Sequence, residues 1–263
     1  MAGAVAEPTR RSPVVTVRSS ALMLDLLAFD LDGTLADTES LKALSYGWAA
    51  HQLRPDVDPD DVQEAYERYV GRSREEIAQG LLDQFELADA ARQHDAAVEP
   101  WESFVGLRLE RYRAMLADAD RVRANARPAS LLVPRAHRWA RSVALVTTTD
   151  RQNADLVLGA LGLADAFDAI VTADDVAVTK PDPEAYRLAL DRLGADAGRS
   201  LAVEDSRAGA LGAVHAGLRV LVAPDRVTRE GVHGLVEAGT LPTADVLDPS
   251  GLEDAIRRAS DEG

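Results

Sequence analysis

Residues 24–39 read LDLLAFDLDGTLADTE, and this stretch places two aspartates at the end of an apolar run. Asp30 ends the run, and Asp32 follows two positions later, directly before Gly33 and Thr34. The run has the apolar character of a strand that is buried on both faces. Burying a carboxylate without a partner costs several kcal/mol. The stretch therefore predicts that a cation, an electrophile or both lie against the two carboxylates.

Further apolar runs in the second half of the chain predict more strands of the same kind. Helical stretches that finish in glycine separate these runs, and this is typical of strand–helix alternation. Such alternation indicates a parallel sheet covered by helices on both faces. We therefore expect an α/β fold with a doubly wound, Rossmann-like parallel sheet. Besides the run that ends at Asp30, the expected strands are 142–147, 169–172, 200–205 and 219–222.

The stretch between the first and second expected strands reads as helical. Apolar residues recur there at helical spacing in 38–53, 59–71, 73–87 and 100–118. Ligands of open parallel sheets bind at the carboxyl ends of the strands, so an insertion that leaves from that end would cover the site. We expect a disordered tail over 1–22, an α/β core from 23–37 and 127–263, and a helical cap over 38–126.

Composition restricts the partners of the chain. The 263 residues carry a formal net charge of -15, which argues against nucleic acid or an anionic membrane as a partner. There are no cysteines, so disulfides and thiolate chemistry are excluded. No apolar run reaches the roughly 18 residues of a membrane span, and no separate apolar region follows Arg10 and Arg11 as an export signal requires. We expect a cytoplasmic monomer, with Met23 as an alternative start of translation.

Polar residues follow the other expected strands as well. Thr147 ends the strand 142–147, Lys180 follows the third, and Glu204 and Asp205 end the fourth. Singly, such residues are typical of turns, helix caps and solvated loops. Together at one sheet edge, carboxylates, a hydroxyl and an ammonium suit phosphoryl transfer with Mg²⁺. The combination favours a shared site over separate structural roles.

In this order, FDLDGT, Thr147, Lys180 and the Glu204–Asp205 pair resemble the four motifs of the haloacid-dehalogenase (HAD) superfamily of hydrolases. The resemblance covers roughly residues 24–225. The helical insertion resembles the branch that contains β-phosphoglucomutase and many sugar-phosphate phosphatases, among them Rubisco-accessory sugar bisphosphate phosphatases. The resemblance implies an HAD core with an inserted helical cap and a small phosphate ester as substrate.

The resemblance also implies a role for each motif residue. Asp30 would be the nucleophile that forms an aspartyl-phosphate, and Asp32 would be the general acid and base. Thr147 would donate a hydrogen bond to the transferring phosphoryl group, and Lys180 would neutralise its charge. Gly33 would permit the tight turn and lie near the substrate. The metal ligands of the resemblance, for Mg²⁺, are Asp30, the Asp32 backbone carbonyl, Glu204 and Asp205.

Residues of the expected cap are candidates for contact with the rest of the substrate. GRSREE (71–76) resembles the segment that carries a substrate-binding arginine in β-phosphoglucomutase-like proteins, which suggests Arg74 as a ligand for a distal anion. The same segment predicts a helix start with Ser73 and Glu76 as a capping box, and both interpretations can hold. Lys42 is either an anion ligand or an exposed helix lysine. Thr38 and Thr148 complete the substrate-binding candidates.

Three functions agree with these residues. The first is an Mg²⁺-dependent phosphatase that acts on a sugar phosphate or bisphosphate. The second is a phosphomutase of the β-phosphoglucomutase type, although many relatives of that branch carry a histidine where this chain has Lys42. The third is a non-catalytic phospho-aspartate signalling protein, against which Asp32 and the large helical insertion both argue.

Overall fold

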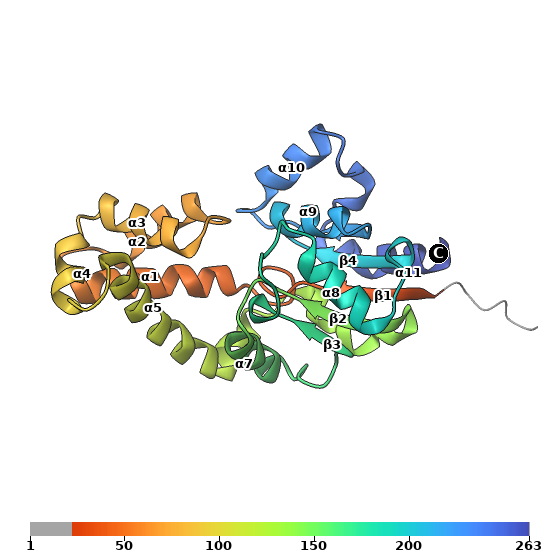
Figure 1. Cartoon of the computed structure of the whole chain (residues 1–263), viewed down its shortest axis with the longest axis horizontal. Helices are drawn as coiled ribbons and strands as arrows, with labels where there is room; N and C mark the ends of the chain where they lie inside the picture. Colours follow the sequence, from red (N-terminus) through yellow and green to blue (C-terminus); the bar gives the residue numbers. More distant parts are fainter. Residues whose placement is uncertain (1–22, 263) are drawn as a thin grey trace, which may run out of the picture.

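A five-stranded parallel sheet forms the centre of the computed structural model, which describes residues 23–262 (Figure 1). The expected tail over 1–22 lies outside the described residues. The strand order is β3-β2-β1-β4-β5, so the first strand of the chain lies in the middle of the sheet. The expected α/β fold with a parallel sheet is confirmed. The strands are β1 (Leu24–Phe29), β2 (Ala140–Val146), β3 (Ala169–Val171), β4 (Ser200–Glu204) and β5 (Arg219–Val222).

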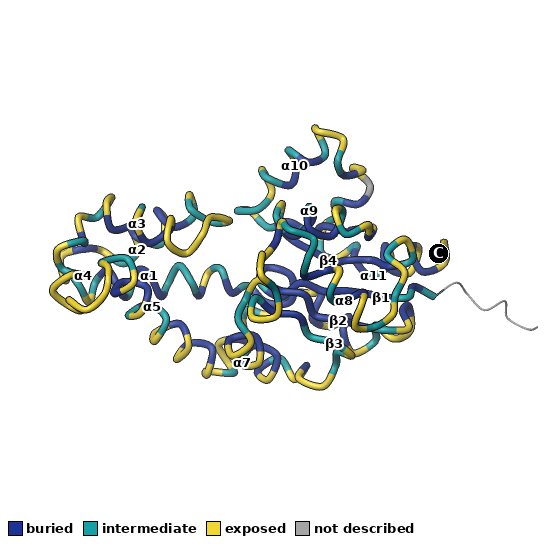
Figure 2. The backbone as a smooth tube through the Cα atoms, in the orientation of Figure 1, coloured by how far each residue is buried: buried dark blue, intermediate teal, exposed yellow. Residues whose placement is uncertain are grey.

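Helices cover both faces of the sheet, as the apolar strands require. Leu27 and Phe29 of β1 pack against a cluster that includes α7 and α11, while Leu26 and Ala28 face a cluster with α8, α9 and α10. All four side chains are fully buried, so β1 is apolar on both faces from Leu26 to Phe29 (Figure 2). These helices are α7 (Arg151–Leu161), α8 (Glu184–Leu193), α9 (Arg207–His215), α10 (Arg229–Glu237) and α11 (Leu252–Glu262).

Most of the chain between β1 and β2 forms a lobe of helices beside the sheet, while its last part, from α6 onward, packs against the sheet (Figure 1). Each of the four helical stretches expected there contains a helix, and two short helices, α4 and α6, were not expected. Only one residue of α4, Ala91, is buried, so its sequence carries little apolar periodicity. The helices are α1 (Thr38–Leu53), α2 (Pro59–Tyr66), α3 (Arg74–Gln84), α4 (Ala88–His94), α5 (Pro100–Ala117) and α6 (Ala119–Ala124).

The lobe has a hydrophobic core of its own. Tyr46 of α1 is buried against Phe104 of α5 and Tyr66 of α2, with ring centroids 5.5 Å and 5.4 Å away. This cluster is separate from the two that cover the sheet. Two independent cores explain why the lobe and the sheet look like distinct bodies in Figure 1. Within residues 23–262, no helix is both long and apolar enough to cross a membrane.

The central position of β1 makes its side chains sensitive to truncation. We expect Leu27→Ala to lower the free energy of unfolding by about 2–5 kcal/mol, because it leaves a cavity in a fully buried layer. Leu131→Ala is the matched control, since Leu131 is 71% exposed and should change the value by less than about 0.5 kcal/mol. Urea unfolding followed by circular dichroism measures both. Equal effects would contradict the central placement of β1.

Candidate active site

An ammonium group connects three strand ends at the carboxyl edge of the sheet. The Lys180 Nζ donates to Asp30 Oδ1 at 2.8 Å, to Glu204 Oε1 at 2.6 Å and to the Val146 carbonyl at 2.7 Å. These contacts use all three protons of the ammonium, so its position is fixed. The Lys180 side chain is only 3% exposed, so it is not a solvated loop lysine. The site is therefore built around a buried, fully bonded cation.

Charge explains why Lys180 stays protonated there. Burial alone would lower its pKa, but the carboxylates of Asp30 and Glu204 raise the pKa of Lys180 above its ordinary value. Tyr186 of α8 contributes twice: its hydroxyl donates to Glu204 Oε1, and its ring lies 5.0 Å below the Lys180 Nζ. The ring face adds a cation–π contact to a desolvated ammonium.

Three carboxylates gather beside this ammonium. Ligand atoms of Asp30, Glu204 and Asp205 all lie within 4.8 Å of one another. Burial and the charge of Glu204 raise the pKa of Asp30 to about 7, and burial with Asp30 raises the pKa of Asp205 well above its ordinary value. Within the described chain, Glu204 Oε2 is buried and has no hydrogen-bond partner. This set of hard oxygen atoms with excess negative charge fits a divalent cation.

Two glycines make room for the carboxylate cluster. A Cβ at Gly33 would lie 2.2 Å from Asp205 Oδ2, and the backbone φ of +84° at Gly33 also disfavours any other residue. A Cβ at Gly209 of α9 would lie 2.0 Å from Glu204 Oε2. Helix α9 itself begins after Ser206, whose side chain accepts from the Gly209 N–H. Helix capping therefore accounts for the presence of Ser206 at the start of α9 but does not account for the neighbouring Asp205.

Asp32 belongs to a second network that faces the helical lobe. Its Oδ1 accepts from the Thr38 hydroxyl and its Oδ2 from the Thr149 hydroxyl. The Lys42 Nζ lies 3.3 Å from Asp32 Oδ1 and 2.6 Å from Glu39 Oε1. Although burial opposes ionisation, Lys42 and the two hydroxyls hold the pKa of Asp32 below its ordinary value. Asp32 is therefore a carboxylate held by residues from the lobe and the core.

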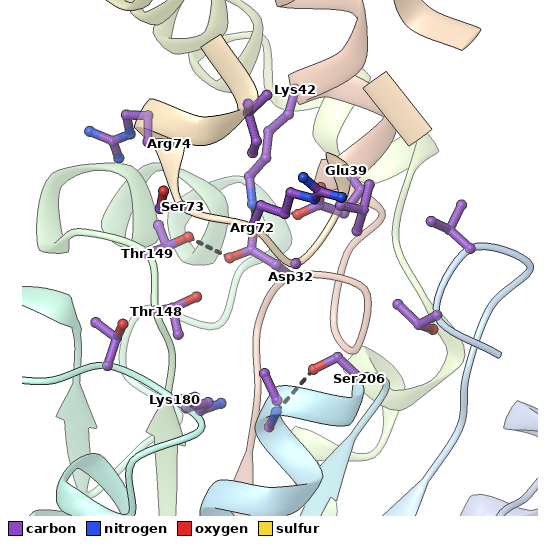
Figure 3. A pocket seen from close by; sticks show the side chains of 18 of the residues that line it. Asp32, Glu39, Lys42, Arg72, Ser73, Arg74, Thr148, Thr149, Lys180 and Ser206 are labelled. Carbon is purple, nitrogen blue, oxygen red and sulfur yellow. Dashed lines mark hydrogen bonds and ion pairs between the residues drawn. The ribbon is translucent and has the colours of Figure 1, made fainter. Parts of the chain in front are cut away.

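The expected candidates do not all occupy the same surface. Lys42 extends from the lobe toward Asp32, and its side chain is 20% exposed, so the interpretation as an exposed helix lysine is wrong (Figure 3). Thr148 lies on the wall of the cavity described below. Thr147 is 2% exposed and is not among the cavity-lining residues; its hydroxyl accepts from the Thr149 N–H. Thr149, which was not expected, makes the contact to Asp32.

A cavity of about 1030 Å³ lies between the lobe and the sheet, and residues of both line it. Asp30, Asp32 and Lys180 belong to its wall on the core side. Lys42 and Arg74 line it from the lobe. The cavity is large enough to hold a small metabolite in contact with both networks.

Arg74 sits at the start of α3, where the expected capping box is confirmed. The Ser73 hydroxyl accepts from the Glu76 N–H, and the Glu76 carboxylate accepts from the Ser73 N–H at 2.9 Å. Arg74 is exposed, and in Figure 3 its side chain points to the side and not toward Asp32. Arg74 is thus a residue of the cavity rim.

The structure also brings residues to the cavity that sequence reasoning missed. Arg108 of α5 is 5% exposed and lines the cavity together with Tyr46 and Tyr112. Phe104, Arg108 and Tyr112 are spaced by four residues, so they share one face of the helix. An arginine on the buried face of an amphipathic helix is the signal that could have identified this position.

Comparison with known proteins agrees with the motifs. The model of the haloacid dehalogenase-like hydrolase family matches residues 24–217. Protein CbbY of Cereibacter sphaeroides is 33% identical over 213 residues, which are 79% of this chain and 87% of that protein. Phosphoglycolate phosphatase of Mesorhizobium japonicum is 29% identical over 89% of this chain and 97% of its own.

The structure of a related protein is also similar to that of this chain. The crystal structure of a CbbY mutant from Rhodobacter sphaeroides in complex with xylulose 1,5-bisphosphate has a TM-score of 0.59 and 29% identity, covering 79% of this chain and 89% of that one. The chain belongs to the haloacid dehalogenase-like hydrolase family. The resemblance expected from the four motifs is confirmed, and a phosphatase is the class of enzyme that the family and these relatives support.

The close approach at Gly209 gives a test of the carboxylate cluster. We expect Gly209→Ala to lower the free energy of unfolding by about 1–3 kcal/mol, because the new methyl group displaces the Glu204 carboxylate from Lys180. Gly212→Ala on the same helix is the control, since its Cβ would meet nothing closer than 3.4 Å. Thermal unfolding measures both variants. A Gly209→Ala protein as stable as Gly212→Ala would show that Glu204 is not held as described.

Proposed function

We propose that this protein is an Mg²⁺-dependent phosphatase that hydrolyses a small phosphorylated metabolite, a sugar phosphate or bisphosphate, through an aspartyl-phosphate. The observation that carries the proposal is the buried group of Asp30, Lys180, Glu204 and Asp205 next to the cavity. Three carboxylates and one ammonium leave an excess negative charge that a divalent cation balances. The complex of CbbY with xylulose 1,5-bisphosphate and the name phosphoglycolate phosphatase support a small phosphorylated metabolite as the substrate.

Asp30 is the nucleophile in this proposal. One of its carboxylate oxygens forms a bond to phosphorus while the bond from phosphorus to the ester oxygen breaks. Lys180, bonded to Asp30 Oδ1, keeps the carboxylate oriented and offsets negative charge on the phosphoryl oxygens. Mg²⁺, held by Asp30, the Asp32 carbonyl, Glu204 and Asp205, would supply further charge neutralisation when bound. Thr147 remains the proposed hydrogen-bond donor to the phosphoryl group.

Asp32 moves the protons of both steps. In the first step it protonates the leaving ester oxygen, and in the second it removes a proton from the water that hydrolyses the aspartyl-phosphate. The Lys42 ammonium and the hydroxyls of Thr38 and Thr149 favour its ionised form. An arriving phosphate dianion opposes that effect, because like charge raises the pKa of a carboxylate. Substrate binding therefore favours the protonated form of Asp32, which acts as the acid. Transfer of that proton to the leaving group restores the Asp32 carboxylate, which acts as the base.

The lobe acts as the cap of this enzyme. We infer the boundaries expected from the sequence, with residues 38–126 as cap and 23–37 with 127–263 as core. The cavity separates the two bodies, and α1 and α5 both run from the lobe toward the sheet (Figure 1). A substrate in the cavity contacts Thr148 near the core and Lys42 and Arg74 on the lobe. The cap therefore selects the part of the substrate that does not react. The expected substrate contacts of Gly33 and Thr38 do not fit this cavity, because both residues are buried and neither lines it.

Release of inorganic phosphate from a panel of sugar phosphates and bisphosphates tests the function. We expect release with Mg²⁺ and none with EDTA, and Asp30→Asn should abolish release because an amide is a poor nucleophile. Thermal unfolding shows whether the variant is folded. Phosphate migration within a hexose phosphate, without release, would instead identify a mutase. Near-normal turnover by Asp30→Asn would remove Asp30 as the nucleophile.

Arg74 should distinguish substrates by their distal group. We expect Arg74→Ala to lower kcat/KM roughly tenfold for substrates with a second anion, because an exposed arginine contributes about 1 kcal/mol or somewhat more to an anion contact. A simple aryl phosphate should be affected much less. Arg92→Ala is the control, since Arg92 lies in α4 and pairs with Asp89 outside the cavity. Equal losses on both substrates would refute the role of Arg74.

A further inference from the structure

The two oxygens of the Glu204 carboxylate have different surroundings. Oε1 accepts two hydrogen bonds, one from the Lys180 Nζ at 2.6 Å and one from the Tyr186 hydroxyl. Oε2 is buried and accepts none from the residues that the structure describes, 23–262. Glu204 as a whole is 1% exposed, and a buried carboxylate oxygen without a donor is unfavourable. Oε2 is therefore the atom of Glu204 that is available to a cation.

Packing of helix α8 places the Tyr186 hydroxyl at this point. Tyr186 is fully buried in the cluster that α8, α9 and α10 form against the sheet. A Cβ on Gly212 of α9 would lie 3.6 Å from the Tyr186 ring, so α9 lies directly against it. The ring centre also lies 5.0 Å from the Lys180 Nζ. Because close packing confines the ring, the bond from its hydroxyl to Glu204 is a fixed part of the site.

The number of lone pairs on Oε1 shows what the second hydrogen bond does. A carboxylate oxygen has about two lone-pair sites, each of which can accept a hydrogen bond or bind a metal ion. Lys180 occupies one site of Oε1, and its other two protons are used by Asp30 and the Val146 carbonyl. Lys180 alone would therefore leave one site of Oε1 open. Tyr186 fills that site, so Glu204 offers only Oε2 to a cation.

This restriction affects two common divalent cations differently. Mg²⁺ is small and requires near-ideal octahedral coordination, whereas Ca²⁺ takes about six to eight oxygen ligands and can bind both oxygens of one carboxylate. Asp30 also has one oxygen, Oδ1, bonded to Lys180. Two of the three clustered carboxylates thus have an oxygen that is already engaged. The cluster therefore suits a cation that needs few ligands better than one that needs many.

We propose that Tyr186 is a positioning residue that makes Glu204 a single-oxygen ligand and thereby gives the metal site its preference for Mg²⁺ over Ca²⁺. This inference rests on the proposed function, in which the cation is Mg²⁺, and adds a determinant of metal choice that lies outside the four motifs. Tyr186 does not bind the cation. It acts through Glu204, by occupying the oxygen that a Ca²⁺ ion would use as an additional ligand.

Titration of the substrate-free protein with each cation tests the proposal. Tyr186→Phe keeps the ring and removes only the hydroxyl, and isothermal titration calorimetry gives the dissociation constants for Mg²⁺ and Ca²⁺. We expect the ratio of the Ca²⁺ constant to the Mg²⁺ constant to fall about tenfold, because Ca²⁺ gains a ligand when a hydrogen bond to a charged oxygen is removed. Tyr69→Phe is the control, since Tyr69 lies in the lobe and does not line the cavity.

The ratio separates positioning from a general structural role. A loosened site would bind both cations more weakly and leave the ratio unchanged, and that result would overturn the proposal. Adding Glu204→Gln to Tyr186→Phe should abolish the gain in Ca²⁺ affinity, because the gain requires the second carboxylate oxygen. A gain that persists in the double variant would show that Tyr186 acts through another residue, which would also overturn the proposal.

The parent protein provides a second measurement, which decides the matter even where Tyr186→Phe does not fold. With one oxygen of Glu204 and one of Asp30 engaged, the parent should bind Mg²⁺ more tightly than Ca²⁺. Equal or tighter binding of Ca²⁺, or no binding of either cation, would overturn the inference. None of these titrations requires a substrate. A parent that shows the expected preference but releases no phosphate from any ester would refute the proposed function and leave the role of Tyr186 supported.

Discussion

The ammonium of Lys180 is the interaction on which the site depends. It is the only group in the described chain that bonds Asp30 and Glu204 at once, and those two residues end the neighbouring strands β1 and β4. Without it, three carboxylates within 4.8 Å of one another would lie in a buried pocket with no opposing charge. Tyr186 and the Val146 carbonyl complete its surroundings, so helix α8 and strand β2 are tied to the same point. The order of the strands in the sheet therefore determines which side chains lie next to one another at this edge.

Much of this arrangement follows from the sequence. The strand that ends at Asp30 is apolar on both faces because it lies in the middle of the sheet, and that position is what a continuous apolar run encodes. The five strands were expected within about two residues of their observed bounds, because apolar runs flanked by glycine and polar residues leave few alternatives. Lys180 could be placed at the site because the carboxyl ends of parallel strands share one edge, although its burial and its three bonds could not be foreseen.

The remaining features depend on contacts that no local pattern encodes. Whether Thr147 or Thr149 reaches Asp32 is decided by the path of the loop after β2, and both residues read alike in the sequence. Helix α4 buries only Ala91, so it lacks the apolar stripe on which recognition relies. Arg108 is one of several arginines on α5, and only the packing of Tyr46 and Tyr112 against it distinguishes it from its exposed neighbours.

Three of the cations that line the cavity, Lys180, Lys42 and Arg108, differ in their counter-ions. Lys180 is saturated by Asp30 and Glu204, so its position at the carboxyl edge of the sheet is fixed. Lys42 is shared between Asp32 and Glu39, and from the lobe side it favours the ionised form of Asp32. Among residues 23–262, Arg108 has no carboxylate partner, although it lies next to a well-packed aromatic core. The pairing of the cations therefore differs between the sheet side and the lobe side of the cavity.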